Sequence, residues 1–320
     1  MEALETVEFL DPVCELQTEY QPEDYEGDDP RWCKGCGDHA ILQAVQRMLH
    51  ASQIAPESVV CVSGIGCSSR FPYYLKTYGF HGIHGRALPI SLGVALARED
   101  LHVITVMGDG DCFSIGAGHW LHAMRYNPNL LVLVFDNEVY ALTKKQASPT
   151  TKTGMNTNTT PHGAFLQPLN PLSVMLGMPN LSFLAQTATW IPAHLTATIE
   201  RAWNHRGMAF VRILQRCPIF SPTAFGADGN PSVDLAFLEH EEGIRIEKVL
   251  RKRGEIIAHN PRNLENARHL AEQTAVERMG LLYYNPAVPV YDDLRRSQVT
   301  RLTAEQKLET MEAELNKYTI

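Results

Sequence analysis

The sequence predicts an α/β fold in which a mainly parallel sheet is covered by helices on both faces. Residues 59–63, 103–107 and 130–135 are short apolar runs rich in β-branched side chains, which is typical of buried strands. Segments with helical periodicity separate these runs, and strands that are apolar throughout need cover on both faces of their sheet. The chain has 320 residues, 44% of them hydrophobic, so it can bury a sizeable core.

The elements alternate along the chain. An amphipathic helix over 37–51 is followed by the strand 59–63, which runs into Gly64. The predicted order then continues with a helix over 88–98, the strand 103–107, a helix over 116–126, the strand 130–135, a Thr-, Lys- and Pro-rich loop over 144–163, a strand at 182–186, a helix near 193–205 and a strand at 210–214. This order predicts one α/β domain over residues 31–225.

The two ends of the chain differ from this middle part. Residues 1–30 hold eleven acidic side chains and no Lys or Arg, and we predict an extended arm that lies on the body or on a partner. A dedicated docking site for a cationic partner is the alternative for this arm. Residues 226–320 are predicted to be a C-terminal extension with charged helical segments, a Pro-rich stretch at 285–293 and a last helix capped by Thr303 and Gln306.

Composition excludes several classes of protein. The net charge of −8 and the lack of a basic stripe argue against nucleic-acid binding. The sequence contains no run of about 18 apolar residues, so it predicts no membrane span. No secretory signal is visible either, so we expect a cytoplasmic protein. The seven cysteines are an odd number, and a reducing compartment disfavours a disulfide framework, which leaves metal ligation or burial.

Polar residues follow the ends of two predicted strands. Gly108-Asp109-Gly110-Asp111 comes after the strand 103–107, and Asp136-Asn137 comes after the strand 130–135. Glycines let the backbone approach a ligand closely, and the carboxyl ends of parallel strands meet at one edge of the sheet. Carboxylate and amide oxygens suit Mg²⁺, which takes its other ligands from phosphate and water. On its own, the Gly-Asp-Gly-Asp sequence would be an ordinary turn. The Asp136-Asn137 pair after the next predicted strand favours a site for a metal ion and a diphosphate instead.

This pattern resembles the diphosphate-binding motif of thiamine-diphosphate enzymes, which has GDG, a spacing in the middle twenties, and Asn-Asn. Asp136 departs from the motif at the first Asn. More of the chain resembles the β subunit of 2-oxoacid:ferredoxin oxidoreductases, most closely the 2-oxoglutarate type (2-oxoglutarate synthase). The resemblance covers about 32–220 and rests on WCKGCGDHAIL (32–42), GIGCSSRFPYYLKTYGFHGIHGRALPISLGVALA (64–97), GDGDCFSIGAGHWLHAMRYNPNL (108–130), DNEVYALTKKQASPT (136–150) and QRCP (215–218).

The resemblance implies a thiamine-diphosphate-binding fold of the diphosphate-binding type, with thiamine diphosphate and Mg²⁺ as cofactors. It assigns Asp109, Asn137 and the backbone carbonyl of Val139 to the Mg²⁺ ion. The full set of implied cofactor-binding residues is Ile65, Gly66, Cys67, Ser68, His84, Gly108, Asp109, Gly110, Asp111, Asn137, Val139 and Leu142. Taken alone, His84 is an ordinary surface or core histidine.

Two further residues carry a substrate hypothesis. Arg70 follows Cys-Ser-Ser directly and could bind the distal carboxylate of 2-oxoglutarate, since Arg binds carboxylates with two parallel hydrogen bonds. A surface ion pair is the equal alternative for Arg70. Leu142 matches a position implicated in the family as a wall of the substrate pocket, and simple packing is the alternative there.

The cysteines can be interpreted from their spacing alone or from the family resemblance. Cys33 and Cys36 form a CxxC pair, which alone could be a zinc half-site, a redox dithiol or chance. The resemblance implies that Cys33, Cys36, Cys67 and Cys217 hold one 4Fe–4S cluster, for which thiolates are the standard ligands. Cys61 lies in a predicted strand and is expected to be a buried small side chain.

The resemblance implies oxidative decarboxylation of a 2-oxo acid to its acyl-CoA, with electrons passing to ferredoxin, and the reverse reductive carboxylation. It also implies an obligate α subunit that supplies the glutamate needed to activate thiamine. Pyruvate or broad specificity is an alternative, as is a non-catalytic iron–sulfur or zinc scaffold. A nicotinamide-dependent enzyme is disfavoured because neither Gly64-x-Gly66 nor Gly108-x-Gly110 continues into G-x-G-x-x-G. Thiamine enzymes without iron, such as acetolactate synthases, are much longer chains.

Overall fold

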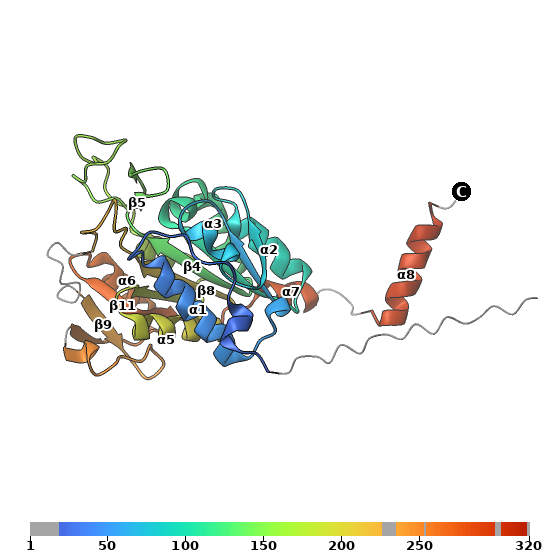
Figure 1. The fold of residues 1–320 in the computed structure, drawn as a ribbon. Coiled ribbons are helices and arrows are strands. Elements are labelled where there is room, and N and C mark those ends of the chain that lie inside the picture. The colour runs from blue at the N-terminus through green and yellow to red at the C-terminus, as the bar shows by residue number, and fades with distance from the viewer. Residues whose placement is uncertain (1–18, 226–234, 253, 298–301, 319–320) are drawn as a thin grey trace, which may run out of the picture.

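The computed structural model describes residues 19–225, 235–252, 254–297 and 302–318. A nine-stranded sheet forms the centre, with helices packed on both of its faces (Figure 1). Its strands are β1 Val59–Ser63, β2 Tyr78–His81, β3 His102–Gly108, β4 Leu130–Asp136, β7 Phe183–Ala188, β8 Met208–Leu214, β9 Leu235–Glu239, β10 Glu255–Ala258 and β11 Glu277–Tyr284. A separate two-stranded sheet pairs β5 Val139–Tyr140 with β6 Gln146–Ala147.

The strand order is β10-β9-β11-β7-β8-β4-β3-β1-β2. Every neighbouring pair is parallel except β11 with β7, which are antiparallel. The six strands from β7 to β2 therefore end at one edge of the sheet, and β9 to β11 run the opposite way. The predicted mainly parallel sheet is confirmed, because eight connected strand pairings include a single antiparallel one.

The helices are α1 Asp38–Ser52, α2 Ala87–Ala97, α3 Ala117–Tyr126, α4 Pro171–Leu176, α5 Pro192–Trp203, α6 Leu264–Glu272, α7 Tyr291–Ser297 and α8 Ala304–Asn316. Helices α1 and α5 pack on one face of the sheet, where Ile104 and Leu133 point. Helices α2, α3, α4 and α6 pack on the other face, around Val62 and Val132. Both faces of the strands are buried, which is why the strands read as continuous apolar runs rather than as an alternating pattern.

Each helix and strand predicted between residues 37 and 214 is present, with ends that differ by at most two residues. The prediction of charged helical segments after residue 225 was wrong for three stretches, because β9, β10 and β11 extend the sheet there. These strands are short apolar runs, which periodicity alone cannot distinguish from buried helix. Because these strands join the same sheet as the strands before residue 225, the domain boundary proposed near that residue stays a prediction.

The described part of the acidic arm lies on the body. Tyr25 is buried in the short helix η1 (Pro22–Tyr25), and its hydroxyl donates to the Ile54 carbonyl at 2.8 Å. Residues 1–18 of the predicted arm fall outside the described residues. At the other end, the predicted cap of α8 is confirmed, since Gln306 N donates to Thr303 Oγ1 at 3.2 Å.

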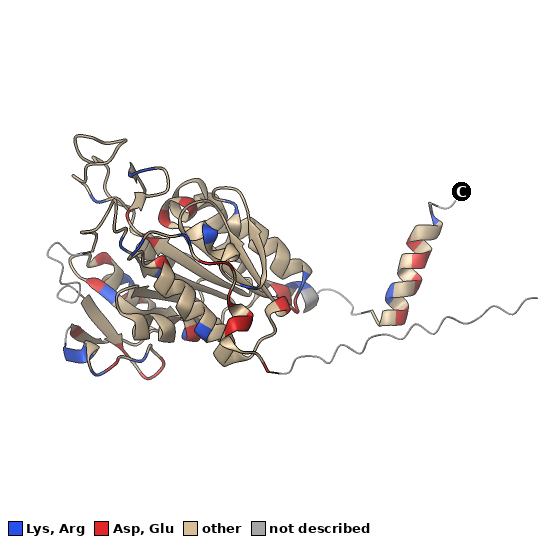
Figure 2. Cartoon of the chain, in the orientation of Figure 1, with Lys and Arg blue, Asp and Glu red and all other residues tan. Residues whose placement is uncertain are grey.

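Acidic and basic residues are scattered along the described chain, and α8 carries both signs (Figure 2). Within the described residues, no helix combines the length and apolar character needed to cross a membrane.

Candidate functional site

A cavity of about 420 Å³ opens at the carboxyl ends of the parallel strands. Its wall is formed by loops that follow β1, β3 and β4, which are neighbours in the sheet. The cavity is lined by Asp38, Ile65, Gly66, Cys67, Ser68, His84, Gly108, Asp109, Gly110, Asp111, Phe135, Asn137, Val139, Tyr140, Ala141, Leu142, Thr143 and Gln146. All twelve residues predicted to bind the cofactor are in this wall, although they come from four separate stretches of sequence.

The three predicted Mg²⁺ ligands meet in this wall. Asp109 follows β3 directly and is 3% exposed, and burial, followed by the charge of Asp136, raises its pKa to about 7. Asn137 begins the turn after β4, where its side-chain oxygen accepts a hydrogen bond from Val139 N at 3.1 Å. Glu138, which lies between Asn137 and Val139, has a φ of 62°, a left-handed conformation that a non-glycine residue seldom adopts. Backbone strain of this kind is typical of ligand-binding turns.

Asp111 ties two of the cavity loops together. Its Oδ1 accepts from Gly85 N at 2.6 Å and from Ile65 N at 3.3 Å, and it lies 2.8 Å from His84 Nδ1. Gly64 allows this arrangement, since a Cβ at that position would lie 2.1 Å from Asp111 Oδ2. Asp111 therefore fixes the position of His84 at the cavity, and it begins a five-residue π-helix (Asp111–Ile115), a form frequent at functional sites.

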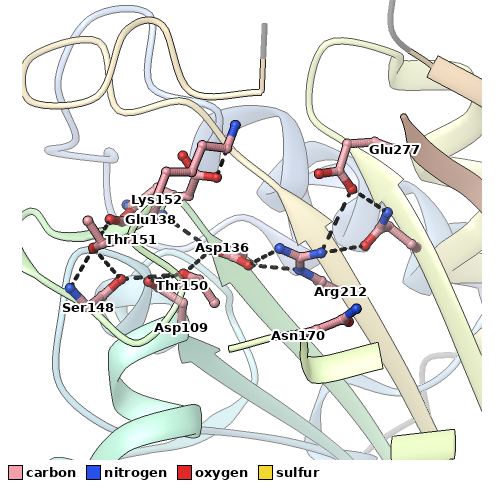
Figure 3. Close-up of polar contacts among 12 residues, drawn as sticks. Asp109, Asp136, Glu138, Ser148, Thr150, Thr151, Lys152, Asn170, Arg212 and Glu277 are labelled. Atoms are coloured by element: carbon pink, nitrogen blue, oxygen red, sulfur yellow. Dashed lines mark hydrogen bonds and ion pairs between the residues drawn. The ribbon is translucent and has the colours of Figure 1, made fainter. Parts of the chain in front are cut away.

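The departure from the motif at Asp136 is compensated within the sheet. Asp136 ends β4 and is fully buried, and the Arg212 side chain on the adjacent strand β8 reaches its Oδ2 with Nε at 2.7 Å and Nη2 at 2.6 Å (Figure 3). A buried carboxylate without a partner would be strongly unfavourable, so the ion pair is what allows an aspartate at this position.

Of the four cysteines assigned to a cluster, Cys67 lines the cavity and packs against a small apolar cluster that contains Cys217. Burial, followed by the charges of Asp38 and of the thiols Cys217 and Cys33, raises the pKa of Cys67 to about 12. Burial and the charge of Asp38, with Cys67 and Cys217 contributing, also raise the pKa of Cys36. Among the described residues, no group of three or more His, Cys, Asp or Glu side chains is arranged to hold a single metal ion.

Hydrogen bonds join the segments that carry these cysteines. Trp32 Nε1 donates to the Cys67 carbonyl at 2.7 Å, which holds the CxxC segment against the loop after β1. Gln215 Nε2 donates to Cys36 Sγ at 3.1 Å, which holds the segment of Cys217 against α1. Gly37 makes room for this contact, because a Cβ there would lie 2.8 Å from Gln215 Cγ.

The structure separates the two residues of the substrate hypothesis. Leu142 lines the cavity and is 51% exposed. Arg70 is outside the cavity wall, where its Nη1 donates to the Arg31 carbonyl at 3.3 Å and its guanidinium lies 5.8 Å from the centre of the Tyr74 ring. Its charge lowers the pKa of Cys67 against the larger effect of burial.

Sequence reasoning missed several residues of the cavity, of which Asp38 and Tyr140 are the most informative. Asp38 is the first residue of α1 and is 1% exposed, and burial raises its pKa to about 7 against a hydrogen bond with Cys36. Its Oδ2 has no hydrogen-bond partner among the described residues. The position of Asp38 directly after Cys36-Gly37 was the available signal. Tyr140 lies three residues after Asn137, and its hydroxyl donates to the Gly110 carbonyl at 3.2 Å.

Comparison with known proteins agrees with this geometry. Residues 64–213 match the family model described as "Thiamine pyrophosphate enzyme, C-terminal TPP binding domain". The chain is 40% identical over 298 residues to the 2-oxoglutarate oxidoreductase subunit KorB of Mycobacterium tuberculosis, covering 84% of this chain and 79% of that protein. It is 33% identical over 264 residues to a 2-oxoacid:ferredoxin oxidoreductase subunit beta from a Sulfolobus species, covering 82% and 84%.

The solved structure of 2-oxoglutarate:ferredoxin oxidoreductase from Magnetococcus marinus, with 2-oxoglutarate, coenzyme A and succinyl-CoA bound, has a chain that superposes with a TM-score of 0.78. The sequence identity is 32%, and the alignment covers 93% of this chain and 97% of that one. The shared fold includes the thiamine-binding domain, and the similarity extends over nearly the whole chain. The protein belongs to the family of 2-oxoacid:ferredoxin oxidoreductase β subunits.

Proposed function

We propose that this chain is the thiamine-diphosphate- and 4Fe–4S-binding β subunit of an enzyme that converts 2-oxoglutarate to its acyl-CoA and reduces ferredoxin. The observation that carries the proposal is the overlap of two predicted residue sets at one cavity. The twelve residues of the thiamine motif line this cavity, and among the four cysteines of the cluster set Cys67 lines it too and packs against the apolar cluster that contains Cys217. Because Cys67 belongs to both sets, the two cofactors would be neighbours.

The residues present fit thiamine diphosphate and Mg²⁺. The cavity of about 420 Å³ is within the usual range for small-molecule sites, roughly 300–1,000 Å³. The Asp109 carboxylate, the Asn137 amide oxygen and the Val139 carbonyl are an all-oxygen donor set, which suits a hard cation that binds phosphate as well. Gly108 and Gly110 allow the backbone to approach the diphosphate.

The cysteines suit a cluster. Four thiolates are the standard ligand set of a 4Fe–4S cluster, and Cys33, Cys36, Cys67 and Cys217 supply four. Gln215 Nε2 and Phe220 N donate to the sulfur atoms of Cys36 and Cys217 at 3.1 and 3.4 Å, so both sulfur atoms already have N–H donors of the kind that tune a bound cluster. When bound, thiamine diphosphate supplies the carbon at which a 2-oxo acid loses carbon dioxide, and the cluster accepts electrons.

The proposal includes an α subunit. Thiamine activation needs a carboxylate beside the aminopyrimidine ring, and the described residues that line the cavity include no glutamate. We infer that the partner supplies this glutamate and that the β chain alone is inactive. The names of the relatives support 2-oxoglutarate as substrate and ferredoxin as acceptor, and they include an enzyme named for 2-oxo acids in general.

The test is to purify the chain anaerobically with its α subunit and to measure iron, acid-labile sulfide and thiamine diphosphate per β chain. The proposal predicts a ratio of about four iron, four sulfide and one thiamine diphosphate, and faster ferredoxin reduction with 2-oxoglutarate than with pyruvate. Thiamine diphosphate without iron would indicate a non-redox decarboxylase or transferase. Iron without thiamine would leave an electron-transfer scaffold, and turnover by the β chain alone would refute the need for the partner.

A further inference from the structure

A chain of polar contacts runs from the cavity wall across four strands of the sheet (Figure 3). It starts at Asp109 after β3 and passes through Thr150 to Asp136 at the end of β4. From there it continues through Arg212 on β8 to Gln186 on β7 and Glu277 on β11. Only Asp109 of these six residues lines the cavity. The other five therefore connect to the cavity through Asp109.

Thr150 is the link between the cavity and the rest of this chain of contacts. It is 3% exposed, and its hydroxyl lies 2.9 Å from Asp109 Oδ2 and 2.8 Å from Asp136 Oδ1. A hydroxyl has one proton and can donate it fully to one of the two carboxylates only. Which carboxylate receives the proton depends on how well each is satisfied by other donors.

Asp136 is already well satisfied. Arg212 contacts its Oδ2 at 2.7 and 2.6 Å, and Glu138 N donates to its Oδ1 at 3.2 Å. The Thr150 proton is therefore available to Asp109 Oδ2. A charge-assisted hydrogen bond from a buried hydroxyl fixes the orientation of a carboxylate, and it remains when the other oxygen binds a cation.

Arg212 is itself held from the far side. Its Nη1 donates to Gln186 Oε1 at 2.9 Å, and Gln186 Nε2 donates to Glu277 Oε2 at 3.0 Å. Glu277 begins β11, so the antiparallel strand from the C-terminal region supports the site. Arg212 is 8% exposed, and a buried guanidinium fixed on several sides holds Asp136 in one position.

We propose that Thr150 is a positioning residue for Asp109, with the Asp136–Arg212 ion pair as its anchor. The inference rests on the proposed function, because it takes Asp109 as a ligand of the Mg²⁺ that binds the diphosphate. It adds a role for the first position of the Asp-Asn pair. There Asp136 supports the metal ligand on the neighbouring strand without reaching the metal.

The test compares Thr150→Val, Thr150→Ser and Thr105→Val in the αβ enzyme freed of thiamine diphosphate. Mg²⁺ is titrated at a fixed excess of thiamine diphosphate, and cofactor binding is followed by calorimetry. Thr150→Val removes the hydroxyl at nearly constant volume and is expected to raise the half-saturating Mg²⁺ concentration by ~10–100-fold, as outer-shell substitutions do. Thr150→Ser keeps the hydroxyl and is expected to stay within about threefold of the wild type.

Thr105→Val is the structural control. Thr105 is a buried threonine of β3, the strand that ends beside Asp109, and its hydroxyl donates to Ser91 Oγ at 2.7 Å. The Thr105→Val substitution is expected to lower the melting temperature without changing the Mg²⁺ requirement. Equal Mg²⁺ requirements for the wild type and Thr150→Val would overturn the inference alone. Failure of the wild type to bind thiamine diphosphate would overturn the proposed function instead.

Discussion

Gly110 is the position where the smallest substitution should have the clearest effect on the cavity. A Cβ at Gly110 would lie 2.1 Å from Tyr140 Cε1 and 2.4 Å from Cζ. The backbone there has φ −67° and ψ −34°, which alanine adopts freely, so any loss comes from the collision and not from the backbone. To relieve it, the Tyr140 ring must turn, give up its hydrogen bond to the Gly110 carbonyl and move within the cavity wall.

The size of the effect follows from these contacts. Overpacking costs ~1–3 kcal/mol, and the lost hydrogen bond adds ~1 kcal/mol. Alanine recovers ~0.4–1 kcal/mol by restricting the unfolded chain. We therefore expect Gly110→Ala to destabilise the protein by roughly 1–3 kcal/mol. Because the displaced ring shares the space of the ligand, thiamine diphosphate should also bind ~10-fold more weakly or worse, which is about 1.4 kcal/mol.

Gly118 offers the same substitution without the collision. It lies in α3 on the surface, and a Cβ there would have no neighbour within 4 Å. Gly118→Ala should stabilise the helix by up to ~1 kcal/mol and leave cofactor binding unchanged. Thermal unfolding and calorimetric titration of both variants are the assays. If Gly110→Ala were as stable as Gly118→Ala and bound thiamine diphosphate like the wild type, the steric argument would be refuted.

Three further predictions concern the cluster, the metal and acid stability. Cys217→Ser should lose most of the bound iron, whereas Cys61→Ser, at a fully buried strand position, should keep it; equal iron in both would contradict the cluster assignment. Asn137→Ala should raise the Mg²⁺ requirement at least ~10-fold with the iron content unchanged, and an unaltered requirement would remove Asn137 from the metal site. Burial lowers the pKa of His194 to about 3 in the folded protein, whereas an unfolded histidine has a pKa of ~6.5. The stability that depends on neutral His194 is therefore fully present above the unfolded pKa and is lost as the pH falls towards about 3. Between pH 7 and 5 the wild type should lose ~2 kcal/mol more than His194→Asn in unfolding experiments, and parallel pH curves would contradict this.

The sequence was most informative where one local rule decides the structure. The strand at residues 59–63 has five buried side chains between turn residues, and its bounds were predicted without error. The capping box of Thr303 and Gln306 likewise depends on four neighbouring residues. The cavity residues could be predicted because they sit at strand ends, and the parallel direction of the strands brings those ends together.

The rest depends on contacts between residues far apart in sequence. Arg212 reads as one polar residue in an apolar strand, and its partner Asp136 is 76 residues away. Asp38 follows a cysteine motif, but its burial depends on how α1 packs against the loops. Arg70 lies outside the cavity wall, where its Nη1 donates to the Arg31 carbonyl, so the substrate contact suggested by its place beside a cofactor motif stays a prediction. No local pattern contains this information.

The C-terminal strands show that the site depends on more of the chain than the motif-bearing part. Residues 235–284 supply β9 and β11, whose Leu235 and Met279 pack against Ala188 and Leu214 at the ends of β7 and β8. Without β11, Gln186 would lose both of its acceptors, Glu277 Oε2 and the Arg278 carbonyl. Arg212 would then keep Asp136 and Gln186, but the Gln186 side chain would lose the contacts that hold it in place. The boundary near residue 225 marks a change of sequence pattern, yet the polar contacts that fix Asp109 cross it, so the strands on both sides must fold together for the site to form.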